Sequence, residues 1–501
     1  MTRRIEAGAG VVALLALVAM LLVPFRGSSP GAAADLLLAK SDFGAFYCGS
    51  LVMRTGGDPY KLSPLAACET QRVYEPAHLT LRSQGIDPAP LPAYDLAFFA
   101  PLTSLPYRAA GLLWLGLIAA AFCGSALALR TLTGLPFALT LAALAYGDGA
   151  ICFTYGQEQP LVTLGLTGAA IALAAKRDGR AVACATIAFL EPQIGLPTML
   201  ALTLFSRARI AAMSVMAGLG LLSLAFGGWS ANVEYLTRVL PVHAFSELGV
   251  DIQYSFASLM FAARVPDALA LQIAGVQYVL TAGLGIALAA PLAQRIGRPA
   301  LVLLPAACAV VGGTFIHIQE IASALPFALY LVGRVPVSRP WSAIAVALLA
   351  LPWPLQSSRE ALVFDAIVIG ALCTWLRPAR TTIANAALAL VLFAVYLATA
   401  RAMTALPQTP LRAPDSAAAM TAARYDPALA STELAYEWRA SRASDGATLS
   451  HLAKRAPTWL ALIVLVLLAA RLTVRKTQIG DPAVKSAPLT VPRAPAARGA
   501  A

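Results

Sequence analysis

Charged residues are scarce in this sequence, and their scarcity excludes a soluble globular protein. Only 12% of the 501 residues are Asp, Glu, Lys or Arg, against about 25% in soluble domains. Hydrophobic residues make up 59% of the chain and gather in runs long enough to cross a bilayer, which takes about 20 residues in a helix. Because lipid offers the backbone no hydrogen-bond partners, these runs predict an all-α polytopic membrane protein.

Metal-binding patterns and internal repeats are also missing from the sequence. None of the seven cysteines belongs to a CxxC pair or to a cysteine–histidine group with the spacing of metal ligands. Five of them lie in or beside apolar segments and are expected to pack there, whereas Cys48 and Cys68 share one polar loop. That loop holds no DxD pair, so we predict neither an obligatory metal nor another cofactor.

About fourteen apolar segments are spaced along the chain, and 12–14 of them are expected to form a bundle of transmembrane helices. They cover approximately residues 9–25, 105–129, 134–150, 160–175, 181–190, 194–205, 210–228, 268–290, 299–316, 320–333, 341–355, 361–376, 382–400 and 457–470. Basic clusters at the ends of these segments all fall on one side, which the positive-inside rule makes the cytoplasmic side, together with both termini. These clusters are Arg3 and Arg4, Arg130, 176–180, 206–209, Arg295 and Arg298, Arg334 and Arg339, 377–380 and 471–476. The net charge of +12 is therefore explained by topology, and no nucleic-acid partner is expected.

The segments divide the chain into four regions. These are a transmembrane core, residues 1–400, with a first outer loop at 27–104; a second outer loop, 401–456; the last transmembrane helix, 457–476; and a disordered cytoplasmic tail rich in Pro and Ala, 477–501. The segment 9–25 is interpreted as a retained anchor rather than a cleaved signal peptide. The segments 181–190 and 194–205 are too short to span alone, and we expect them to form a helical hairpin inside the bundle.

The first outer loop contains the stretch SDFGAFYCGSLVMRTGGDPY, residues 41–60. Ser41 is a favourable N-cap, which would place Asp42 in the first turn of an amphipathic helix that lies along the membrane surface. The Gly-Gly pair that follows would end this helix. Taken alone, the acid is explained by the helix dipole. The two cysteines of the loop, Cys48 and Cys68, are either a disulfide or two free thiols.

Five more polar motifs follow along the chain. They are PLPAYDLAFFAPLTSLPYRAAGLLWLGL from Pro90, YGQEQPLVTLGL from Tyr155, FLEPQIGLP from Phe189, YSFASLMFAARV from Tyr254 and FIHIQEIASALPFALYL from Phe315. In this order the motifs resemble the polyprenyl-phosphate-sugar-dependent glycosyltransferases of the GT-C fold. More narrowly they resemble family 87, formerly a domain of unknown function, which includes mycobacterial mannosyl- and arabinofuranosyltransferases. The resemblance extends over about residues 12–331 and implies a GT-C type bundle.

The resemblance implies roles for individual residues. Asp42 matches the catalytic acid of the family and would act as general base on an acceptor hydroxyl. His317 matches a late histidine that would contact the donor phosphate, with Glu320 as its i,i+3 neighbour. Glu191 stands where the family usually has Lys, so Arg54 or Arg264 would have to supply positive charge to the donor phosphate. The loop and the acceptor site would be shaped by Tyr47, Arg54, Asp58 and Tyr60, and Gln157 would line the cavity.

Three hypotheses about function are compatible with these residues. The resemblance favours a glycosyltransferase that moves a hexose, as a mannosyltransferase does, from a polyprenyl-phosphate sugar to a glycan or glycolipid acceptor. It would work among the lipids of the bacterial inner membrane, with its active site on the periplasmic face. The alternative is a transporter or flippase, which would carry ionisable residues at the membrane midplane and related halves. The third is a scaffold for envelope assembly, in which Asp42, His317 and Gln157 would be a dipole partner, an interfacial histidine and a loop residue.

Overall fold

The computed structural model describes residues 30–39, 41–77, 89–145, 150–250, 252–350, 398, 402, 405–406 and 448–474. The structure is 83% helical, and the described residues contain no strand, which confirms the predicted all-α class. One isolated antiparallel bridge joins Gln253 to His317.

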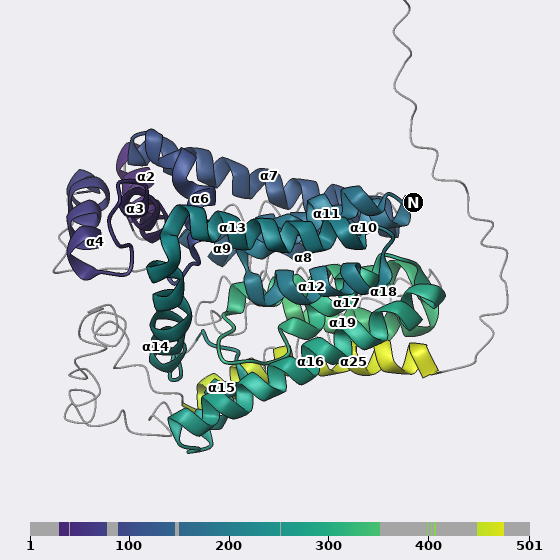
Figure 1. Ribbon diagram of the computed structural model, residues 1–501. Helices are drawn as coiled ribbons and strands as arrows, with labels where there is room; N and C mark the ends of the chain where they lie inside the picture. Colours follow the sequence, from purple (N-terminus) through teal and green to yellow (C-terminus); the bar gives the residue numbers. More distant parts are fainter. Residues whose placement is uncertain are drawn as a thin grey trace, which may run out of the picture.

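Four of the described helices are long and apolar enough to cross a membrane (Figure 1). They are α7 (Tyr107–Thr133), α13 (Arg209–Glu234, continued by η7, Tyr235–Val239, and α14, Leu240–Ser246), α16 (Asp267–Ile296) and α25 (Leu449–Val474). A pair of helices that is bent by 114° at its break would make a fifth span if counted as one. It consists of η8 (Ile318–Ala324), α18 (Leu325–Arg334), η9 (Pro336–Ser338) and α19 (Arg339–Ala350). The chain is therefore a polytopic membrane protein. The segments 9–25 and 361–376, and nearly all of 382–400, lie outside the described residues, so the number 12–14 stays a prediction.

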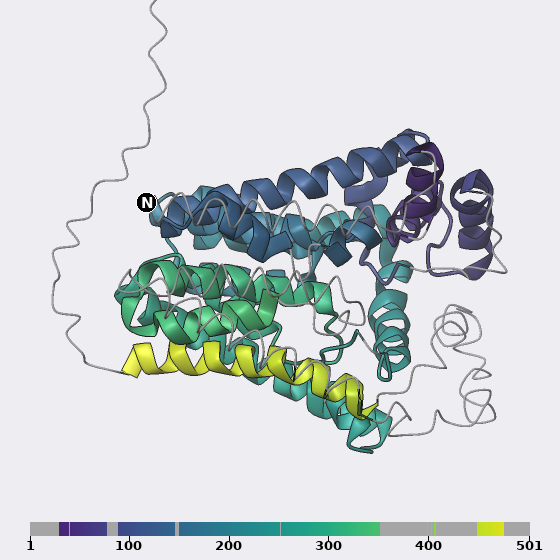
Figure 2. The same ribbon diagram turned by 180° about the vertical axis from the view of Figure 1, so that it is seen from behind.

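Shorter helices complete the bundle between the long ones (Figures 1 and 2). They are α8 (Phe137–Leu144), α9 (Ala150–Tyr155), α10 (Gln159–Ala174), α11 (Asp178–Thr186), η6 (Ile187–Leu190), α12 (Pro192–Phe205), α15 (Phe256–Ala262) and α17 (Ala300–Ala309). The expected hairpin is formed by α11, η6 and α12, and it turns at Glu191. A Cβ atom on Gly195 would lie 2.7 Å from the carbonyl oxygen of Ala188, so glycine permits the close approach of the two arms.

The segments before α7 form a separate group of short helices, called here the N-terminal lobe, which covers one end of the bundle (Figure 2). It consists of α2 (Pro30–Ala39), α3 (Phe43–Arg54), α4 (Leu62–Cys68), η2 (Glu69–Tyr74), η3 (Glu75–Ala77), α6 (Ala93–Phe99) and η4 (Ala100–Ser104). The disulfide between Cys48 and Cys68 joins α3 to the end of α4 and confirms the predicted pairing. Phe43 stacks on Tyr107 and Trp114 at ring-centroid distances of 5.8 and 5.9 Å, which fixes the lobe on α7.

Two expectations about α3 are wrong. We expected one face of the helix to be free at the membrane surface, yet ten of its twelve residues are buried by the surrounding lobe. The helix also begins at Phe43, and the hydroxyl of Ser41 donates to the carbonyl oxygen of Leu38 at 2.8 Å instead of capping α3. Asp42 takes the N-cap position without making a side-chain cap bond, because its carboxylate is engaged elsewhere.

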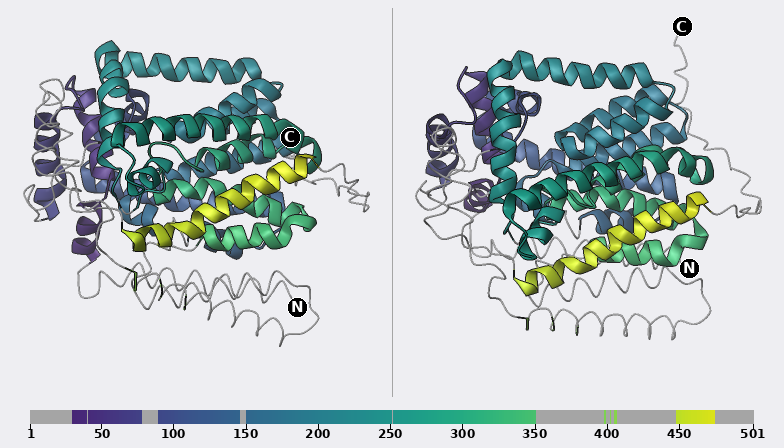
Figure 3. Two further views of the ribbon diagram at one scale, coloured as in Figure 1. Left: turned by 90° about the horizontal axis from the view of Figure 1, so that it is seen from below. Right: turned by 60° about the horizontal axis from the view of Figure 1, so that its bottom comes forward.

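Arginines from several predicted basic clusters gather at one end of the bundle. Arg298, Arg334 and the backbone of Arg207 meet at one end, where Arg298 pairs with Asp178 and Arg334 donates to the carbonyl oxygen of Leu132. This is called the basic end. The N-terminal lobe and α14 lie at the opposite end in every view (Figure 3). The predicted basic clusters that fall within the described residues are thus brought to one end by the fold.

Candidate active site

Asp42 and Gln157 meet at the end of the bundle that the N-terminal lobe covers. The amide of Gln157 donates through Nε2 to the Oδ2 atom of Asp42, and the backbone N–H of Asp42 donates to the carbonyl oxygen of Tyr155 at 2.7 Å. Asp42 is half-buried, so its carboxylate is held in place and still reachable. The first-loop acid and the Gly-Gln motif, which lie 115 residues apart in sequence, therefore form one site.

The backbone conformation of the Gly-Gln turn requires a glycine at position 156. Gly156 has a φ of +67°, a left-handed conformation that L-residues with a Cβ adopt at a cost. A Cβ atom there would also lie 3.1 Å from Cβ of Phe43. The indole N–H of Trp114 donates to the carbonyl oxygen of Gly156 at 2.6 Å, which fixes the turn beneath α3.

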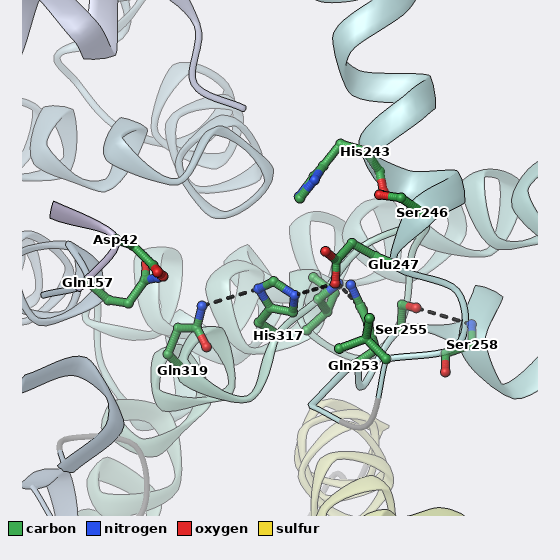
Figure 4. A network of polar contacts seen from close by, with 12 residues as sticks. Asp42, Gln157, His243, Ser246, Glu247, Gln253, Ser255, Ser258, His317 and Gln319 are labelled. Atoms are coloured by element: carbon green, nitrogen blue, oxygen red, sulfur yellow. Dashed lines mark hydrogen bonds and ion pairs between the residues drawn. The ribbon is translucent and has the colours of Figure 1, made fainter. Parts of the chain in front are cut away.

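His317 lies at the same end of the bundle, in an extended segment before η8. Its neighbours pair with the loop after α14, since Tyr254 N–H donates to Ile316 at 2.7 Å and Ile318 N–H donates to Ile252 at 3.1 Å. The ring nitrogens contact two side chains, Glu247 Oε2 at 3.0 Å from Nε2 and Gln319 Nε2 at 3.3 Å from Nδ1 (Figure 4). Burial lowers the pKa of His317 to about 3, so the imidazole of the unliganded protein is neutral near pH 7.

Sequence reasoning missed Glu247 as the partner of His317. We expected Glu320, three residues away, but Glu320 contributes only its backbone N–H to the carbonyl oxygen of His317, at 3.1 Å. Its side chain belongs with Glu191 and Gln193 instead. No local spacing could have revealed Glu247, because 70 residues separate it from His317 and the fold alone brings them together.

A group of buried acids lies beside Asp42. Asp95, Glu158, Glu191 and Glu320 are at most 8% exposed, and Glu158 and Glu320 lie within electrostatic range of Glu191. Gln193 donates to Glu191 at 2.5 Å. Both oxygens of the Asp95 carboxyl are buried and have no hydrogen-bond partner among the described residues, and burial raises the pKa of this carboxyl well above its ordinary value. Asp95 was quoted within a motif but not singled out from the sequence.

Several predicted site residues hold the N-terminal lobe together. The hydroxyl of Tyr47 donates to Leu105 at 2.9 Å, that of Tyr60 donates to Leu91 at 2.7 Å, and Arg54 donates to Thr103 at 3.3 Å. The carboxylate of Asp58 accepts the backbone N–H of Tyr60 at 2.9 Å, which closes the G-x-D-P-Y turn. These contacts give the four residues a part in shaping the lobe.

Two arginines of the site end take different positions. Arg264 is exposed in the turn after α15, with a φ of +64°. Arg455 is fully buried and donates to Ser258 at 2.9 Å and to the carbonyl oxygen of Val250 at 2.8 Å, which supports the loop that pairs with His317. Arg455 was missed because the last helix was expected from residue 457, whereas α25 begins at Leu449.

No group of three His, Cys, Asp or Glu side chains within the described residues is arranged to hold a metal ion. The expectation that the protein needs no metal or other cofactor therefore stays a prediction. The polar groups of the site are carboxylates, amides and one imidazole, which suit proton transfer and the binding of hydroxyl and phosphate groups.

Comparison with known proteins decides the class of this site. Residues 92–318 match the family described as glycosyltransferase family 87. This part of the chain is thus similar to a family of membrane glycosyltransferases. The match covers less than half of the chain and includes Gln157, Glu191, Glu247 and His317, while Asp42 precedes it. No curated protein and no solved structure matches the chain.

Proposed function

We propose that this protein is a glycosyltransferase that moves a hexose, with a mannose-like donor as the first candidate, from a polyprenyl-phosphate sugar to a hydroxyl of a glycan or glycolipid. The observation that carries the proposal is the bond between Gln157 and Asp42. It docks an acid from outside the family match onto a motif inside it. The half-buried carboxylate of Asp42 then lies beside the Gly-Gln turn that would line a substrate cavity.

The chemistry follows from the position of Asp42. Its carboxylate would accept the proton of the acceptor hydroxyl while that oxygen attacks the anomeric carbon of the donor sugar. The bond from the anomeric carbon to the phosphate oxygen breaks, and its electron pair leaves with the polyprenyl phosphate. Gln157 would hold the carboxylate in one orientation by donating to Oδ2.

We also propose the orientation in the membrane. The gathering of Arg207, Arg298 and Arg334 at the basic end supports a cytoplasmic position for that end, by the positive-inside rule. Asp42 and His317 would then face the periplasm of a bacterial inner membrane, and both termini would be cytoplasmic. A lipid-borne donor would reach the site from within the bilayer and a glycan or glycolipid acceptor from the water side.

The test compares wild type with Asp42→Asn in nanodiscs. Each protein receives a panel of radiolabelled polyprenyl-phosphate sugars and a crude envelope fraction as acceptor. We expect wild type to transfer one of the sugars and Asp42→Asn to lose about 10²–10⁴-fold in rate, because the amide cannot accept the proton. Asp178→Asn makes the same change at the basic end and should transfer at the wild-type rate.

Equal transfer by wild type and a folded Asp42→Asn would remove Asp42 as the base. Transfer by wild type from a nucleotide sugar, with none from the lipid-linked donors, would overturn the donor class. Accumulation of lipid-linked substrate inside vesicles, without a glycosylated product, would favour the transporter alternative.

A further inference from the structure

The environment of His317 is built from three separate elements. Glu247 comes from the turn that ends α14, is fully buried, and lies 3.0 Å from Nε2 of the imidazole. Gln319 comes from η8 and lies 3.3 Å from Nδ1. The backbone bridge between Gln253 and His317 holds the segment that carries the ring. Both ring nitrogens are therefore occupied, and each by a different kind of group.

These contacts define which nitrogen carries the proton. In the orientation that the structure gives to Gln319, the amide nitrogen faces Nδ1, and since this nitrogen only donates, Nδ1 accepts from it. The remaining nitrogen, Nε2, then carries the hydrogen and donates to the carboxylate of Glu247. A carboxylate on one side of an imidazole also favours a second proton on the other side, because it stabilises the imidazolium.

The two nitrogens face different parts of the site. In Figure 4, Gln319 and Nδ1 lie on the side of the ring toward Asp42 and Gln157, and Glu247 lies on the other side. A sugar attacked at its anomeric carbon beside Asp42 would carry its phosphate away from Asp42, toward this imidazole. The contact of Gln319 with Nδ1 is long at 3.3 Å, so a phosphate oxygen could replace the amide at little cost.

We propose that Glu247 is a positioning residue for His317. Its carboxylate accepts Nε2–H and thereby keeps Nδ1 of the imidazole directed at the donor phosphate. A phosphate oxygen would then take the place that the Gln319 amide occupies in this structure. Binding of the anionic donor takes up one proton from water at Nδ1, and the new N–H donates to a phosphate oxygen. The Glu247 carboxylate balances the charge of the imidazolium. This inference rests on the proposed polyprenyl-phosphate donor. It adds Glu247 as the residue that prepares His317 to bind the donor phosphate.

Other titratable groups surround the ring and have to be separated from it. His243 on α14 has its ring centroid 6.5 Å from that of His317. Glu320 on η8 bonds to the backbone of His317, and Glu191 at the start of α12 lies within electrostatic range of Glu320. His243→Gln and Glu320→Gln are therefore measured beside Glu247→Gln.

The experiment measures binding of the methyl ester of polyprenyl phosphate to the full chain in nanodiscs between pH 6 and 8. This phosphodiester stays a monoanion over that range, so the ligand itself does not titrate. Because binding is linked to uptake of one proton, the Kd of wild type should rise about tenfold for each pH unit. Glu247→Gln should bind about tenfold more weakly at pH 6 and with a much flatter pH dependence, and Glu247→Asp should recover part of both.

A matched control is Glu69→Gln, which neutralises an equally buried acid in η2 of the N-terminal lobe. It should keep the affinity and the slope of wild type, as should His243→Gln. Glu320→Gln should lose less of the slope than Glu247→Gln, because the contact between Glu320 and His317 is made by the backbone and not by the ring. Wild-type affinity and slope in Glu247→Gln would overturn the inference while leaving the donor class intact. Failure of wild type to bind the ester would instead count against the polyprenyl-phosphate donor.

A second measurement does not depend on a Glu247 variant that folds. The chain has only four histidines, so ¹⁵N-histidine labelling gives few signals, and His317→Gln identifies the one that belongs to residue 317. We expect a neutral ring protonated at Nε2 in the free protein and a ring protonated at both nitrogens after the ester is added. A free ring protonated at Nδ1, or no change on binding, would contradict the proposal.

Discussion

The buried acids at the two ends of the bundle have different hydrogen-bond and ion-pair partners. At the basic end, Asp178 accepts from the Arg298 guanidinium and from the backbone N–H of Arg207, both at 2.7 Å, and these bonds lower the pKa of its carboxyl. At the site end, none of Asp95, Glu158, Glu191 and Glu320 pairs with a Lys or Arg among the described residues. The buried acid of the basic end, Asp178, is thus paired with a cation. The four buried acids of the site end lie near amides and an imidazole instead.

This difference indicates what each end does. A carboxylate bonded to a guanidinium is fixed in its charged form and serves as a latch between segments. Buried carboxyls that meet only neutral donors cost stability, and they remain able to gain or lose a proton. The buried acids of the site end cost stability. The N-terminal lobe offsets this cost through its disulfide and through the aromatic side chains that pack on α7.

The largest effect on stability should come from removing the disulfide. Cys48→Ser opens a bridge between residues 20 positions apart, and the loss of this constraint should cost about 3 kcal/mol. Because the bridge lies in the lobe that carries Asp42, we expect heating to release this lobe before the bundle unfolds. Limited proteolysis of the reduced and the oxidised protein, followed by peptide mapping, would locate the first cuts.

Cys308→Ser serves as the control, since Cys308 is a free, buried thiol of α17 within the bundle. It should leave the protease resistance of the N-terminal lobe unchanged. If Cys48→Ser loosened the basic end as early as the lobe, the two ends would not be independent in stability.

A smaller effect is expected from the latch at the basic end. Asp178→Asn should lower the free energy of unfolding by about 1–2 kcal/mol, since Asp178 is only 7% exposed and its charged bonds to Arg298 and to the backbone N–H of Arg207 are weakened. The pKa of Asp178 is lowered in the folded state. Its contribution is therefore present above pH about 4 and is lost as the pH falls through the folded-state pKa. Thermal unfolding from pH 3 to 7 should show the gap between wild type and variant closing at the acid end.

The comparison between ends also shows what the sequence can predict. Hydropathy and basic clusters were enough for the helical class, for the hairpin around Glu191 and for the meeting of Arg298 and Arg334 at one end. The pairing of Cys48 with Cys68 was one of two open alternatives, and the structure confirms it. These features could be predicted because each depends on the pattern of a single segment or on its position relative to the membrane.

The site end was predicted less well because its contacts cross long stretches of chain. Asp42 and Gln157 were each named, yet their contact depends on how the lobe docks on α7. Glu247 was missed because its partner lies 70 residues away. The burial of α3 was missed because its polar stripe faces protein rather than water. Hydrophobic patterning cannot distinguish a helix at a lipid surface from one inside a polar lobe.

The smallest effect on the free energy of unfolding should come from breaking an ion pair at the site end. This prediction can be compared directly with the one for Asp178. Lys61 lies 2.7 Å from Glu234, but the Glu234 side chain is 13% exposed against 7% for Asp178, so water screens this pair more. Lys61→Met should therefore cost less than about 1 kcal/mol in chemical or thermal unfolding, and 0.5 M salt should remove most of the difference. Arg108→Met, which breaks the more exposed pair with Asp35, should cost still less. A loss in Lys61→Met as large as that in Asp178→Asn would mean that exposure is not what separates the two ends, and that the lobe depends on Lys61 to stay docked against α13.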